Sequence, residues 1–536
     1  MNEEERTPTG WIIACVASIA QNARMESDPM TNPPVLIVGA GPTGLVLALW
    51  LTRCGVAVRI IDRAREPGTT SRALALQIRT LEFYRQLGIA DAIIENGVKI
   101  TALNFWTKGR RVTQVPFQTI GEGRTPYPFV FILPQDVHER LLIERLSQLG
   151  VHLERGTELI SLEQNDHRVR ATLMCKDGFR KICEPAYLAG CDGASSTVRQ
   201  HLNIGFPGGT YAGLFYVADV EATGPANDGN LHIDLEDADF VLVFPMKGGG
   251  RVRLVGAVRD LHQNGGSLRF DDVRGRAIEN LKLNVSRMNW FSTYRVHHRV
   301  AARFRDGRTF LLGDAAHIHS PVGGQGMNTG IGDAVNLAWK LAAVLKGTAA
   351  SDLLDTYESE RIPFARRLVA TTDQAFVFVT KRSTTARFIR TKVIPRAAPF
   401  LLNRAPIRNF LFRTISQTGI SYHDSTLSVG KNGSVAGGDR LPWVLGASGG
   451  DNFAALESLD WQVHVYGKAG VGTVDFCAQV GLPLNVFPWN AESQGAGIER
   501  DALYLIRPDG HVALADSAAK PARLKTYSER HALSFR

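Results

Sequence analysis

The chain of 536 residues contains little cysteine and no long apolar run. Its six cysteines form no C-x-x-C pair and show no spacing typical of metal ligands. This favours reduced thiols in a cytoplasmic protein over a disulfide or zinc scaffold. No apolar run approaches the roughly 20 residues that a membrane-spanning helix needs. Hydrophobic residues make up 44% and charged residues 21%, as in soluble globular proteins. The length predicts two or three domains.

Acidic residues are absent from residues 376–415, and this segment accounts for the net charge of +9. Its nine basic residues are Lys381, Arg382, Arg387, Arg390, Lys392, Arg396, Arg404, Arg408 and Arg413. The rest of the chain is therefore close to neutral. Two interpretations stay open: amphipathic helices with solvated arginines, or a patch that attracts anionic ligands or a partner. No recognisable nucleic-acid-binding fold accompanies the segment, so no nucleic-acid partner is predicted.

A dinucleotide-binding pattern occupies the first third of the chain. Strand, glycine turn, helix, strand and acid follow one another at Val35–Val38, Gly39–Gly44, Leu45–Arg53, Val56–Ile61 and Asp62. Gly39 allows the tight turn, Gly41 lets the backbone approach a pyrophosphate, and Gly44 lets helix and strand pack closely. The helix N-terminus then directs free N–H groups at the phosphates. Asp62 is placed to accept hydrogen bonds from ribose hydroxyls. The pattern leaves open whether the nucleotide is NAD or FAD.

Strands and helices alternate through residues 33–204 and again through 301–375, which predicts a doubly wound parallel sheet. The second part contains a strand at Phe310–Leu312, the Gly313-Asp314 turn and a long helix that begins near Met327. The positive end of that helix would stabilise an anion such as a reduced isoalloxazine. Between the two parts, the β-rich residues 205–300 predict an inserted antiparallel sheet that covers a ligand. A helix is expected there only at Val273–Asn284.

The two ends of the chain differ from this pattern. Residues 1–32 are expected to be a disordered extension, because their apolar run is short and acidic residues precede it. Residues 376–435 predict a helical, basic connecting segment, and Ala436–Pro442 predicts a linker. From 436 to 536 a β-α-β-β order predicts a thioredoxin-like domain. Since that domain has no C-x-x-C, no dithiol chemistry is expected of it.

Three motifs stand in one order: the glycine turn, DGASSTVR at Asp192–Arg199 and GDAAHIHSPVGGQGMN at Gly313–Asn328. Over residues 33–530 the chain resembles the class A, single-component FAD-dependent aromatic hydroxylases. Within them it is most similar to the phenol and aromatic-polyketide branch, which carries a redox-inactive thioredoxin-like domain. The resemblance implies FAD, with NADPH (or NADH) as reductant, and a flavin C4a-hydroperoxide that hydroxylates a small aromatic substrate with O₂. The chain has no second G-x-G-x-x-G after a strand, which fits the family, where NAD(P)H binds without a domain of its own. A homodimer is an open expectation.

The resemblance also implies which residues contact the cofactors. Those expected at the FAD pyrophosphate and adenosine ribose are Gly39, Gly41, Gly44, Asp62 and Arg63. Those expected on the flavin side are Arg72 and Gln135. Those expected to support the pyrophosphate region and the approach of the nicotinamide are Asp192, Gly193 and Arg199. Those expected at the ribityl chain and the isoalloxazine are Gly313, Asp314, Pro321, Gly324, Met327 and Asn328.

Two departures and several alternatives remain. Leu74 stands where the phenol hydroxylases have an Asp near the ring hydroxyl, so assisted ionisation of a simple phenol is not expected. Gly332 stands where a larger polar residue is expected. Pocket walls are predicted at Phe240–Pro245 and Trp290–Tyr294, and the candidate lining residues, each more often structural, are Tyr216, His232, Tyr294, His297 and His298. No catalytic base and no metal ligand is assigned. The alternative activities are Baeyer–Villiger oxidation or epoxidation, a flavoprotein dehydrogenase and a flavin-binding sensor.

Overall fold

The computed structural model describes residues 33–68, 73–117, 121–234, 240–258, 268–320, 322–380, 383–402, 404–446 and 449–535. The expected extension at 1–32 and two candidate site residues, Arg72 and Pro321, lie outside these described residues. Within the part that is described, no helix is both long enough and apolar enough to cross a membrane.

A six-stranded sheet forms the centre of the first layer, in the order β18-β19-β12-β1-β2-β8. Its strands are β1 (Val35–Val38), β2 (Val58–Asp62), β8 (Leu153–Arg155), β12 (Tyr187–Gly190), β18 (Arg305–Asp306) and β19 (Thr309–Leu311). All neighbours pair in parallel except the edge pair β18–β19. The predicted parallel sheet is therefore confirmed, and β1 is buried along its whole length.

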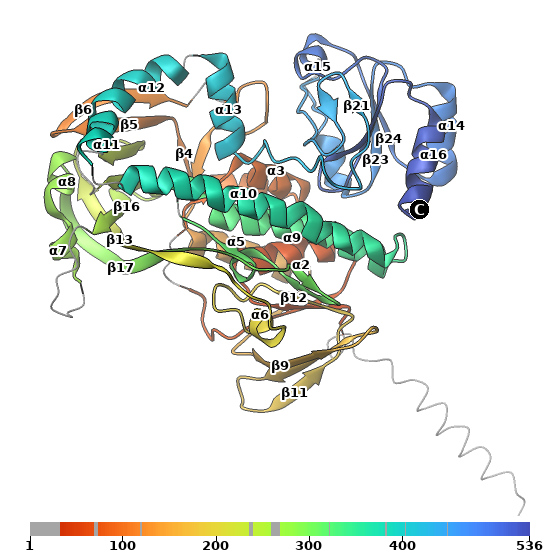
Figure 1. Cartoon of the computed structure of the whole chain (residues 1–536), viewed down its shortest axis with the longest axis horizontal. Helices are drawn as coiled ribbons and strands as arrows, with labels where there is room; N and C mark the ends of the chain where they lie inside the picture. Colours follow the sequence, from red (N-terminus) through yellow and green to blue (C-terminus); the bar gives the residue numbers. More distant parts are fainter. Residues whose placement is uncertain are drawn as a thin grey trace, which may run out of the picture.

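Helices cover this sheet (Figure 1). They are α2 (Pro42–Arg53), α3 (Ile78–Gln86), α4 (Ala90–Glu95), α5 (Gln135–Gln148), α6 (Thr197–His201), α9 (Gly326–Leu345) and the first part of α10 (Asp355–Thr380), with short turns η1 (Gly313–Ala315), η2 (Val322–Gly324) and η3 (Ser351–Leu354). Helix α2 starts at Pro42, where the missing N–H costs nothing. Its apolar residues are buried on all sides because it packs on the sheet and against α5 and α9.

A second, eight-stranded sheet has the order β20-β17-β13-β16-β15-β14-β5-β6. Its strands are β5 (Ala102–Thr107), β6 (Arg110–Pro116), β13 (Gly208–Thr223), β14 (Leu231–Asp234), β15 (Val241–Pro245), β16 (Arg251–Val258), β17 (Asn284–Val300) and β20 (His317–Ile318). Its pairs are antiparallel except β14–β5. The sheet thus also takes strands from before residue 205 and after residue 300.

Residues 268–300 differ from the expectation. Short helices α7 (Phe270–Val273) and α8 (Gly275–Asn280) replace the single helix predicted at Val273–Asn284, and the 17-residue strand β17 follows. Most residues of β17 are only partly buried, so it lacks the apolar alternation by which a strand is recognised. Two small sheets complete this half: β3 (Ala75–Leu76), β7 (Val130–Ile132) and β4 (Val98–Ile100); β9 (Glu158–Gln164), β10 (Val169–Met174) and β11 (Arg180–Cys183).

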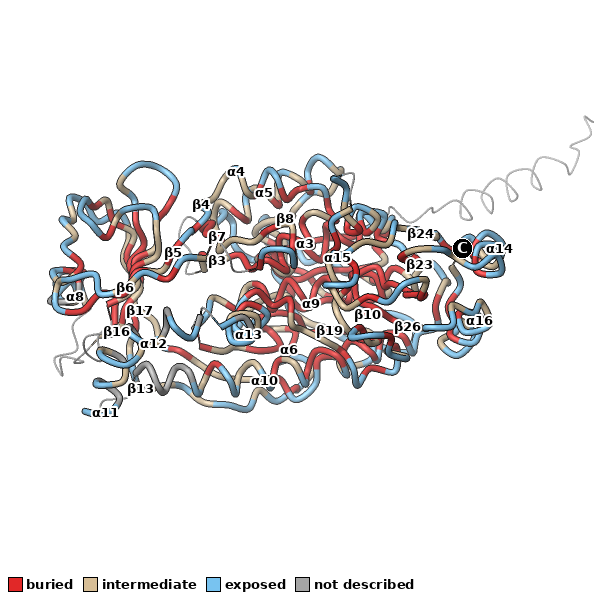
Figure 2. The backbone as a smooth tube through the Cα atoms, turned by 90° about the horizontal axis from the view of Figure 1, so that it is seen from above, coloured by how far each residue is buried: buried red, intermediate tan, exposed pale blue. Residues whose placement is uncertain are grey.

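Among its described residues, the basic segment predicted to be helical over 376–435 has helices only as far as Ile415. Helix α10 runs from the first sheet toward the second, and α11 (Thr384–Phe388), η4 (Ile389–Val393), α12 (Ile394–Leu402) and α13 (Ala405–Ile415) follow it (Figure 1). Seen from above, α11, α12 and α13 are mostly exposed or half-buried, in contrast to the buried α9 (Figure 2).

The C-terminal part contains a four-stranded sheet in the order β24-β23-β25-β26. Its elements are β21 (Lys431–Asn432), β22 (Val435–Ala436), η5 (Ala454–Ser458), β23 (Gln462–Tyr466), α14 (Val471–Val480), β24 (Leu484–Phe487), α15 (Ala491–Gly495), β25 (Leu503–Ile506), β26 (Val512–Asp516) and α16 (Pro521–Arg530). β24 pairs with β23 in parallel, and β25 pairs antiparallel with both β23 and β26.

The segment predicted to be a linker, Ala436–Pro442, is instead fixed to this sheet. The N–H of Gly438 donates to the carbonyl of Val512 at 2.7 Å, and the N–H of Val512 donates to that of Asp439 at 2.8 Å. A Cβ on Gly438 would lie 2.6 Å from the backbone of Tyr422. Glycine is therefore required here for close approach between backbones, and not for flexibility.

Candidate functional site

The three glycines of the first turn differ in their surroundings. Gly39 has φ +105°, and a Cβ on it would lie 2.4 Å from the carbonyl oxygen of Cys191. A Cβ on Gly44 would lie 2.0 Å from the carbonyl oxygen of Gly39. A Cβ on Gly41 would meet no atom within 4 Å outside its chain neighbours. Gly39 and Gly44 are thus required by packing, whereas Gly41 leaves open surface at the N-terminus of α2, where an anion can approach the backbone.

The Asp62 carboxylate is held at the end of β2, beside this turn. Its Oδ2 accepts from the N–H of Ala40 at 2.7 Å, and its Oδ1 accepts from that of Ala64 at 2.8 Å. These bonds fix the carboxylate and leave each oxygen a further lone pair for a hydroxyl. The neighbouring Arg63 is exposed.

The Asp192-Gly193 turn follows the adjacent strand β12. Oδ2 of Asp192 accepts from the N–H of Val198 at 3.1 Å, while its buried Oδ1 has no hydrogen-bond partner. Burial raises the pKa of Asp192, although hydrogen bonds from Ser196 and the backbone oppose this. Gly193 has φ +79° and open space around it. A buried acceptor without a partner next to open glycine surface fits a ligand with hydroxyl or phosphate groups.

Arg199 has a different geometry from the one expected of a cofactor contact. Its Nη1 donates to the carbonyl of Ala315 and its Nη2 to that of Ala194, both at 2.8 Å. Its guanidinium also lies 3.9 Å from the centre of the Phe206 ring. Arg199 therefore ties the DGASSTVR turn to the Gly313-Asp314 turn.

The Gly313-Asp314 turn is packed against the first turn of α2. A Cβ on Gly313 would lie 2.7 Å from Oγ1 of Thr43, and one on Gly330 would lie 2.3 Å from the same oxygen. The Asp314 side chain is reached by solvent, yet protein surrounds it closely enough that burial raises its pKa. The Asp314 carboxyl is therefore both enclosed by protein and open to a ligand.

Asn328 is almost fully buried and saturated with hydrogen bonds. Its Oδ1 accepts from the N–H of Gln77 and from Oγ1 of Thr80, both at 2.8 Å. Its Nδ2 donates to the carbonyls of Ala75 and Gly324, both at 2.9 Å. Asn328, which was expected to border the isoalloxazine, thus fastens β3 and the start of α3 to the glycine turn η2.

The remaining candidates lie around the same turns. A Cβ on Gly324 would lie 2.8 Å from that of Ala75. Met327 is half-buried against the core of the first sheet. The N–H of Gln135 donates to the carbonyl of Ala73 at 3.2 Å, and its Nε2 donates to Glu139 at 2.7 Å. The motifs predicted to act together are therefore neighbours in space.

One face of the eight-stranded sheet is rich in aromatic side chains and faces this region. That face carries Leu103, Phe105, Phe215, Phe240, Leu242 and Tyr294, together with the ion pair Asp219–Arg253. Nη1 of Arg253 reaches the carbonyl of Ala73 at 3.5 Å, which shows that the face is turned toward the glycine turns. Only alternate residues of the predicted walls, such as Phe240 and Leu242, lie on this face.

Two of the candidate lining residues lie on the opposite face. Tyr216 packs there with Trp106 and Val243, under α7 and α8. His232 is fully buried, and its Nδ1 accepts from Nε1 of Trp106 at 2.9 Å. Because successive residues of a strand alternate between faces, they lie away from the face that carries Tyr294 and have the structural role that is more common for such residues.

His297 and His298 lie near the start of β13. Nδ1 of His297 is 2.7 Å from Oγ1 of Thr210, and His298 packs on the ring of Tyr211 with centroids 4.7 Å apart. Among the described residues, no group of His, Cys, Asp and Glu side chains could hold a metal ion.

Sequence reasoning missed Asp333, which organises the Gly313 turn from inside α9. Its Oδ2 accepts from the N–H of Gly313 at 3.0 Å and lies 2.7 Å from Nε2 of His317; its Oδ1 accepts from Nε of Arg361 at 2.6 Å. Burial would raise the pKa of Asp333, but the charges of Arg361 and His317 outweigh it and keep the pKa below the usual value. A charged residue among the mostly apolar residues of this helix was the available signal.

The same network limits the space for a side chain at position 332, where the residue is Gly332. A Cβ there would lie 3.2 Å from Nη2 of Arg361. A larger residue would displace the guanidinium, which also donates to the hydroxyl of Tyr422 at 2.9 Å and to the carbonyl of Thr329 at 3.0 Å. A small cavity lies here, lined among others by Gly332, Tyr422 and His511.

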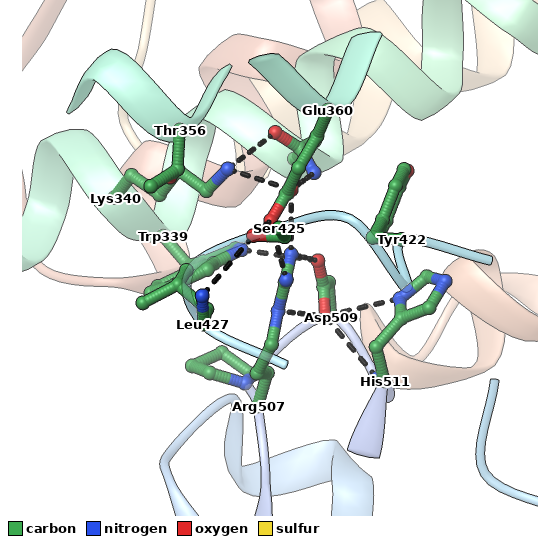
Figure 3. Close-up of polar contacts among 12 residues, drawn as sticks. Trp339, Lys340, Thr356, Glu360, Tyr422, Ser425, Leu427, Arg507, Asp509 and His511 are labelled. Atoms are coloured by element: carbon green, nitrogen blue, oxygen red, sulfur yellow. Dashed lines mark hydrogen bonds and ion pairs between the residues drawn. The ribbon is translucent and has the colours of Figure 1, made fainter. Parts of the chain in front are cut away.

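A buried ion cluster continues from this cavity into the C-terminal sheet (Figure 3). Arg507 donates to Glu360 at 2.7 and 3.0 Å and to Asp509 at 2.6 Å. Lys340 donates to Glu360 at 2.8 Å. Burial would raise the pKa of Glu360, but the charges of Arg507 and Lys340 hold it well below its usual value. The cluster therefore joins α9 and α10 to the end of β25.

The chain matches the FAD binding domain family over residues 32–372. It belongs to that family. It is 35% identical over 521 residues to the 6-methylpretetramide 4-monooxygenase of Streptomyces rimosus, covering 90% of each chain. It is 36% identical over 341 residues to the pentachlorophenol 4-monooxygenase of Sphingobium chlorophenolicum, covering 62% of this chain and 63% of that one. The structure of the OxyS anhydrotetracycline hydroxylase from Streptomyces rimosus aligns with TM-score 0.74 and 28% identity, over 93% of this chain and 98% of that one.

These findings confirm the resemblance to FAD-dependent aromatic hydroxylases and the FAD cofactor. The protein is an FAD-dependent monooxygenase, an oxidoreductase. They also favour this activity over the dehydrogenase and sensor alternatives.

Proposed function

We propose that the protein hydroxylates an aromatic ring of phenolic or polyketide-like type, with NADPH or NADH as the reductant. The observation that carries the proposal is the aromatic face of the eight-stranded sheet, which is turned toward the three cofactor motifs. Flat apolar rings pack well on aromatic side chains. When bound and reduced, FAD supplies the electrons and activates O₂ so that one oxygen atom enters the substrate.

The chain's own groups would hold FAD as follows. The open surface at Gly41 and the N–H groups at the start of α2 take the pyrophosphate, and Asp62 takes the ribose hydroxyls. The free Oδ1 of Asp192 and the carboxyl of Asp314 are acceptors for hydroxyls further along the cofactor. The positive N-terminus of α9, just after Gly324, stabilises negative charge on the isoalloxazine.

Two candidate residues act on the cofactor indirectly. The hydrogen bonds of Arg199 and Asn328 are all made with carbonyls, amides and a hydroxyl of the protein itself. We infer that they position the loops that contact FAD. The backbone of the glycine turns then makes the contacts that the motif assigns to these side chains.

The residues on the substrate side supply a surface that fits a ring, and they supply little acid–base chemistry. Leu74 is buried with Ile100 and Ile132, so its side chain provides no group that could ionise a phenol. Arg253 and Asp219 neutralise each other through two hydrogen bonds, at 2.5 and 2.7 Å. The protein would therefore orient an already electron-rich ring and exclude water from the reacting centre. No catalytic base is assigned.

The finer features of the assembly are also proposals. The strand order and strand directions of the C-terminal sheet support a thioredoxin-like fold for residues 436–536. The chain already contacts this sheet at Val429, whose N–H donates a hydrogen bond to the carbonyl of Ala513. Cys477 is buried in α14, and burial raises its pKa to about 11, which disfavours the reactive thiolate form. Cytoplasmic location and a homodimer complete the proposal.

The test measures NADPH and NADH oxidation by the purified yellow protein with phenols, aryl acids and polycyclic quinones under ¹⁸O₂. The expected result is that one compound accelerates oxidation and gains a single ¹⁸O atom, with NMR placing a hydroxyl on the ring. A lactone or epoxide product would favour the alternative oxygen insertions. Flavin reduction without ¹⁸O in any product over a broad panel would contradict hydroxylation.

A matched pair of variants locates the substrate. Tyr294→Ala lies on the aromatic face and is expected to raise KM at least about tenfold, since a buried aromatic contact contributes roughly 1.5–3 kcal/mol. Phe291→Ala comes from the same strand but lies on the opposite face, and KM should stay unchanged. Equal effects of the two variants would contradict the proposed placement.

A further inference from the structure

Helices α12 and α13 carry a surface that is both apolar and basic. Phe400 is 61% exposed and Phe410 is 69% exposed, and Ile407 is exposed between them in sequence. Arg396, Arg404 and Arg413 are exposed beside them. These six residues define the α12–α13 surface. Large exposed apolar patches with polar rims mark interaction sites, whereas scattered single apolar residues do not.

On α12 the exposed Arg396 and Phe400 are neighbours one turn apart along one side of the helix. Arg404 lies at the N-cap of α13, and its guanidinium is 4.8 Å from the centre of the Phe400 ring. Ile394, by contrast, packs onto the aromatic face of the eight-stranded sheet. α12 therefore has one side on the protein and a different side free.

On α13 the inner side is fixed by Phe412, which is 4% exposed. A Cβ on Gly121 would lie 2.4 Å from the Phe412 ring, so the two residues are in tight contact. Phe410 stands two residues earlier, about 200° around the helix. It therefore points away from the body of the protein, and Ile407 lies beside it on the same outer side.

The charged residues of this region are all basic. Residues 376–415 contain nine Lys and Arg and no Asp or Glu. The positive region extends to the neighbouring loop: burial and the charges of Arg413 and Arg408 together lower the pKa of Arg124. An uncompensated positive surface attracts an anionic partner.

We propose that the α12–α13 surface docks the enzyme reversibly on an anionic phospholipid bilayer. Phe400, Phe410 and Ile407 enter the boundary between headgroups and acyl chains, and the arginines contact lipid phosphates. Basic helices with aromatic and aliphatic residues bind membrane interfaces in this way, lying in the interface without spanning it.

A second copy of the chain fits the surface less well. A two-fold interface places the same patch on both sides, so this face would bring the arginines of one copy against those of the other. The segment has no acid with which to neutralise them. A bilayer of anionic lipids, in contrast, supplies both negative charge and an apolar layer over the same area.

Docking would place the bilayer next to the sheet on which the substrate is proposed to lie. Ile394 of α12 packs with Phe105 and Tyr294 of that sheet. A substrate dissolved in the membrane would then reach the enzyme without crossing water. This consequence rests on the proposed function, whereas the docking itself does not.

The test uses the full-length, FAD-loaded protein and sedimentation with vesicles. Vesicles of phosphatidylglycerol and phosphatidylcholine should carry the protein down, vesicles of phosphatidylcholine alone should carry little, and added salt should weaken binding. The variant Phe400→Ser with Phe410→Ser should lose at least about tenfold in partitioning, which corresponds to about 1.4 kcal/mol. The variant Arg396→Gln with Arg413→Gln should lose the preference for anionic lipid.

The matched control is Phe179→Ser, since Phe179 is 70% exposed on the distant β10–β11 hairpin. It should sediment as the wild type does. All variants should keep bound FAD and an unchanged unfolding midpoint, because the substituted side chains face outward. No sedimentation with anionic vesicles, or equal loss in the control, overturns the proposal. The proposal is also overturned if light scattering shows a mass larger than one chain and only the double serine variant abolishes it. That result would assign the surface to a second copy of the chain.

Discussion

The substitution Asp333→Asn tests whether a buried charge inside α9 holds the cofactor loop in place. Asp333 and Arg361 are each 1% exposed and 2.6 Å apart. The amide keeps the size of the side chain but removes its charge. It also replaces one acceptor oxygen by a donor, although three groups donate to or approach the carboxylate: Arg361, the N–H of Gly313 and His317.

The expected cost follows from the burial. Removing one partner of a buried ion pair costs about 3–5 kcal/mol, because the other charge is left without compensation. The control is Asp355→Asn, since Asp355 is 72% exposed and pairs with Arg305 at the surface. Pairs of that kind contribute about 0.2–1 kcal/mol. The two variants make the same chemical change and differ only in burial.

The assay is urea unfolding of each variant with and without FAD, combined with FAD titration by flavin fluorescence. Asp333→Asn should lose about 3–5 kcal/mol, and it should also bind FAD more weakly because the Gly313 turn loses an anchor. The gap between the midpoints with and without FAD should shrink accordingly. If Asp333→Asn loses no more than Asp355→Asn, the reasoning from the buried network is refuted.

Three further outcomes are expected. Gly41→Ala should keep the urea unfolding midpoint of the wild type but bind FAD at least about tenfold more weakly. Gly44→Ala should fail to fold stably, since its Cβ would lie 2.0 Å from a carbonyl oxygen. Equal solubility and equal unfolding midpoints of the two variants would contradict this. Arg199→Lys can satisfy only one of the two carbonyls and should cost about 1.5–3 kcal/mol in urea unfolding, with weaker FAD binding; an unchanged midpoint would show that the bridge is not needed. Burial lowers the pKa of His138 in the folded chain to about 3. Between this pKa and the ordinary value near 6.5, the side chain is protonated in the unfolded chain but not in the folded chain. The free energy of unfolding therefore falls as pH drops below about 6.5. At pH 5 this costs about 2 kcal/mol, and His138→Phe should remove that part of the difference between urea midpoints at pH 7 and pH 5.

Much of the first sheet could be predicted from local sequence. The buried strand Val35–Val38 and the helix after it follow from apolar runs bounded by glycine, and both exist close to the expected limits. Strand β16 has the predicted bounds, Arg251–Val258, because its residues alternate between two buried faces. Such elements are determined by neighbours in the chain, so a short window of sequence contains the needed information.

Elements whose partners are distant in sequence could not be predicted in the same way. The residues of Ala436–Pro442 look like a linker because glycine is most common in flexible turns. Gly438 is instead pressed against the backbone of Tyr422, a contact that only the folded chain defines. Sequence likewise could not tell that Tyr216 and His232 lie on the opposite face of the second sheet from Tyr294, because the direction of a side chain depends on register and not on residue type.

Motif residues can be assigned to a site from sequence without their mode of action being known. Arg199 and Asn328 lie beside the glycine turns, yet the guanidinium bridges two carbonyls and the amide makes four hydrogen bonds within the protein. A saturated side chain has nothing left to offer a ligand, so its effect on FAD must pass through the loops it fixes. We propose that the cofactor contacts are made by groups that are open, such as Gly41, or left without a partner, such as Oδ1 of Asp192. In this proposal Arg199 and Asn328 hold the turns, and the turns hold the cofactor together with the carboxylates of Asp62, Asp192 and Asp314.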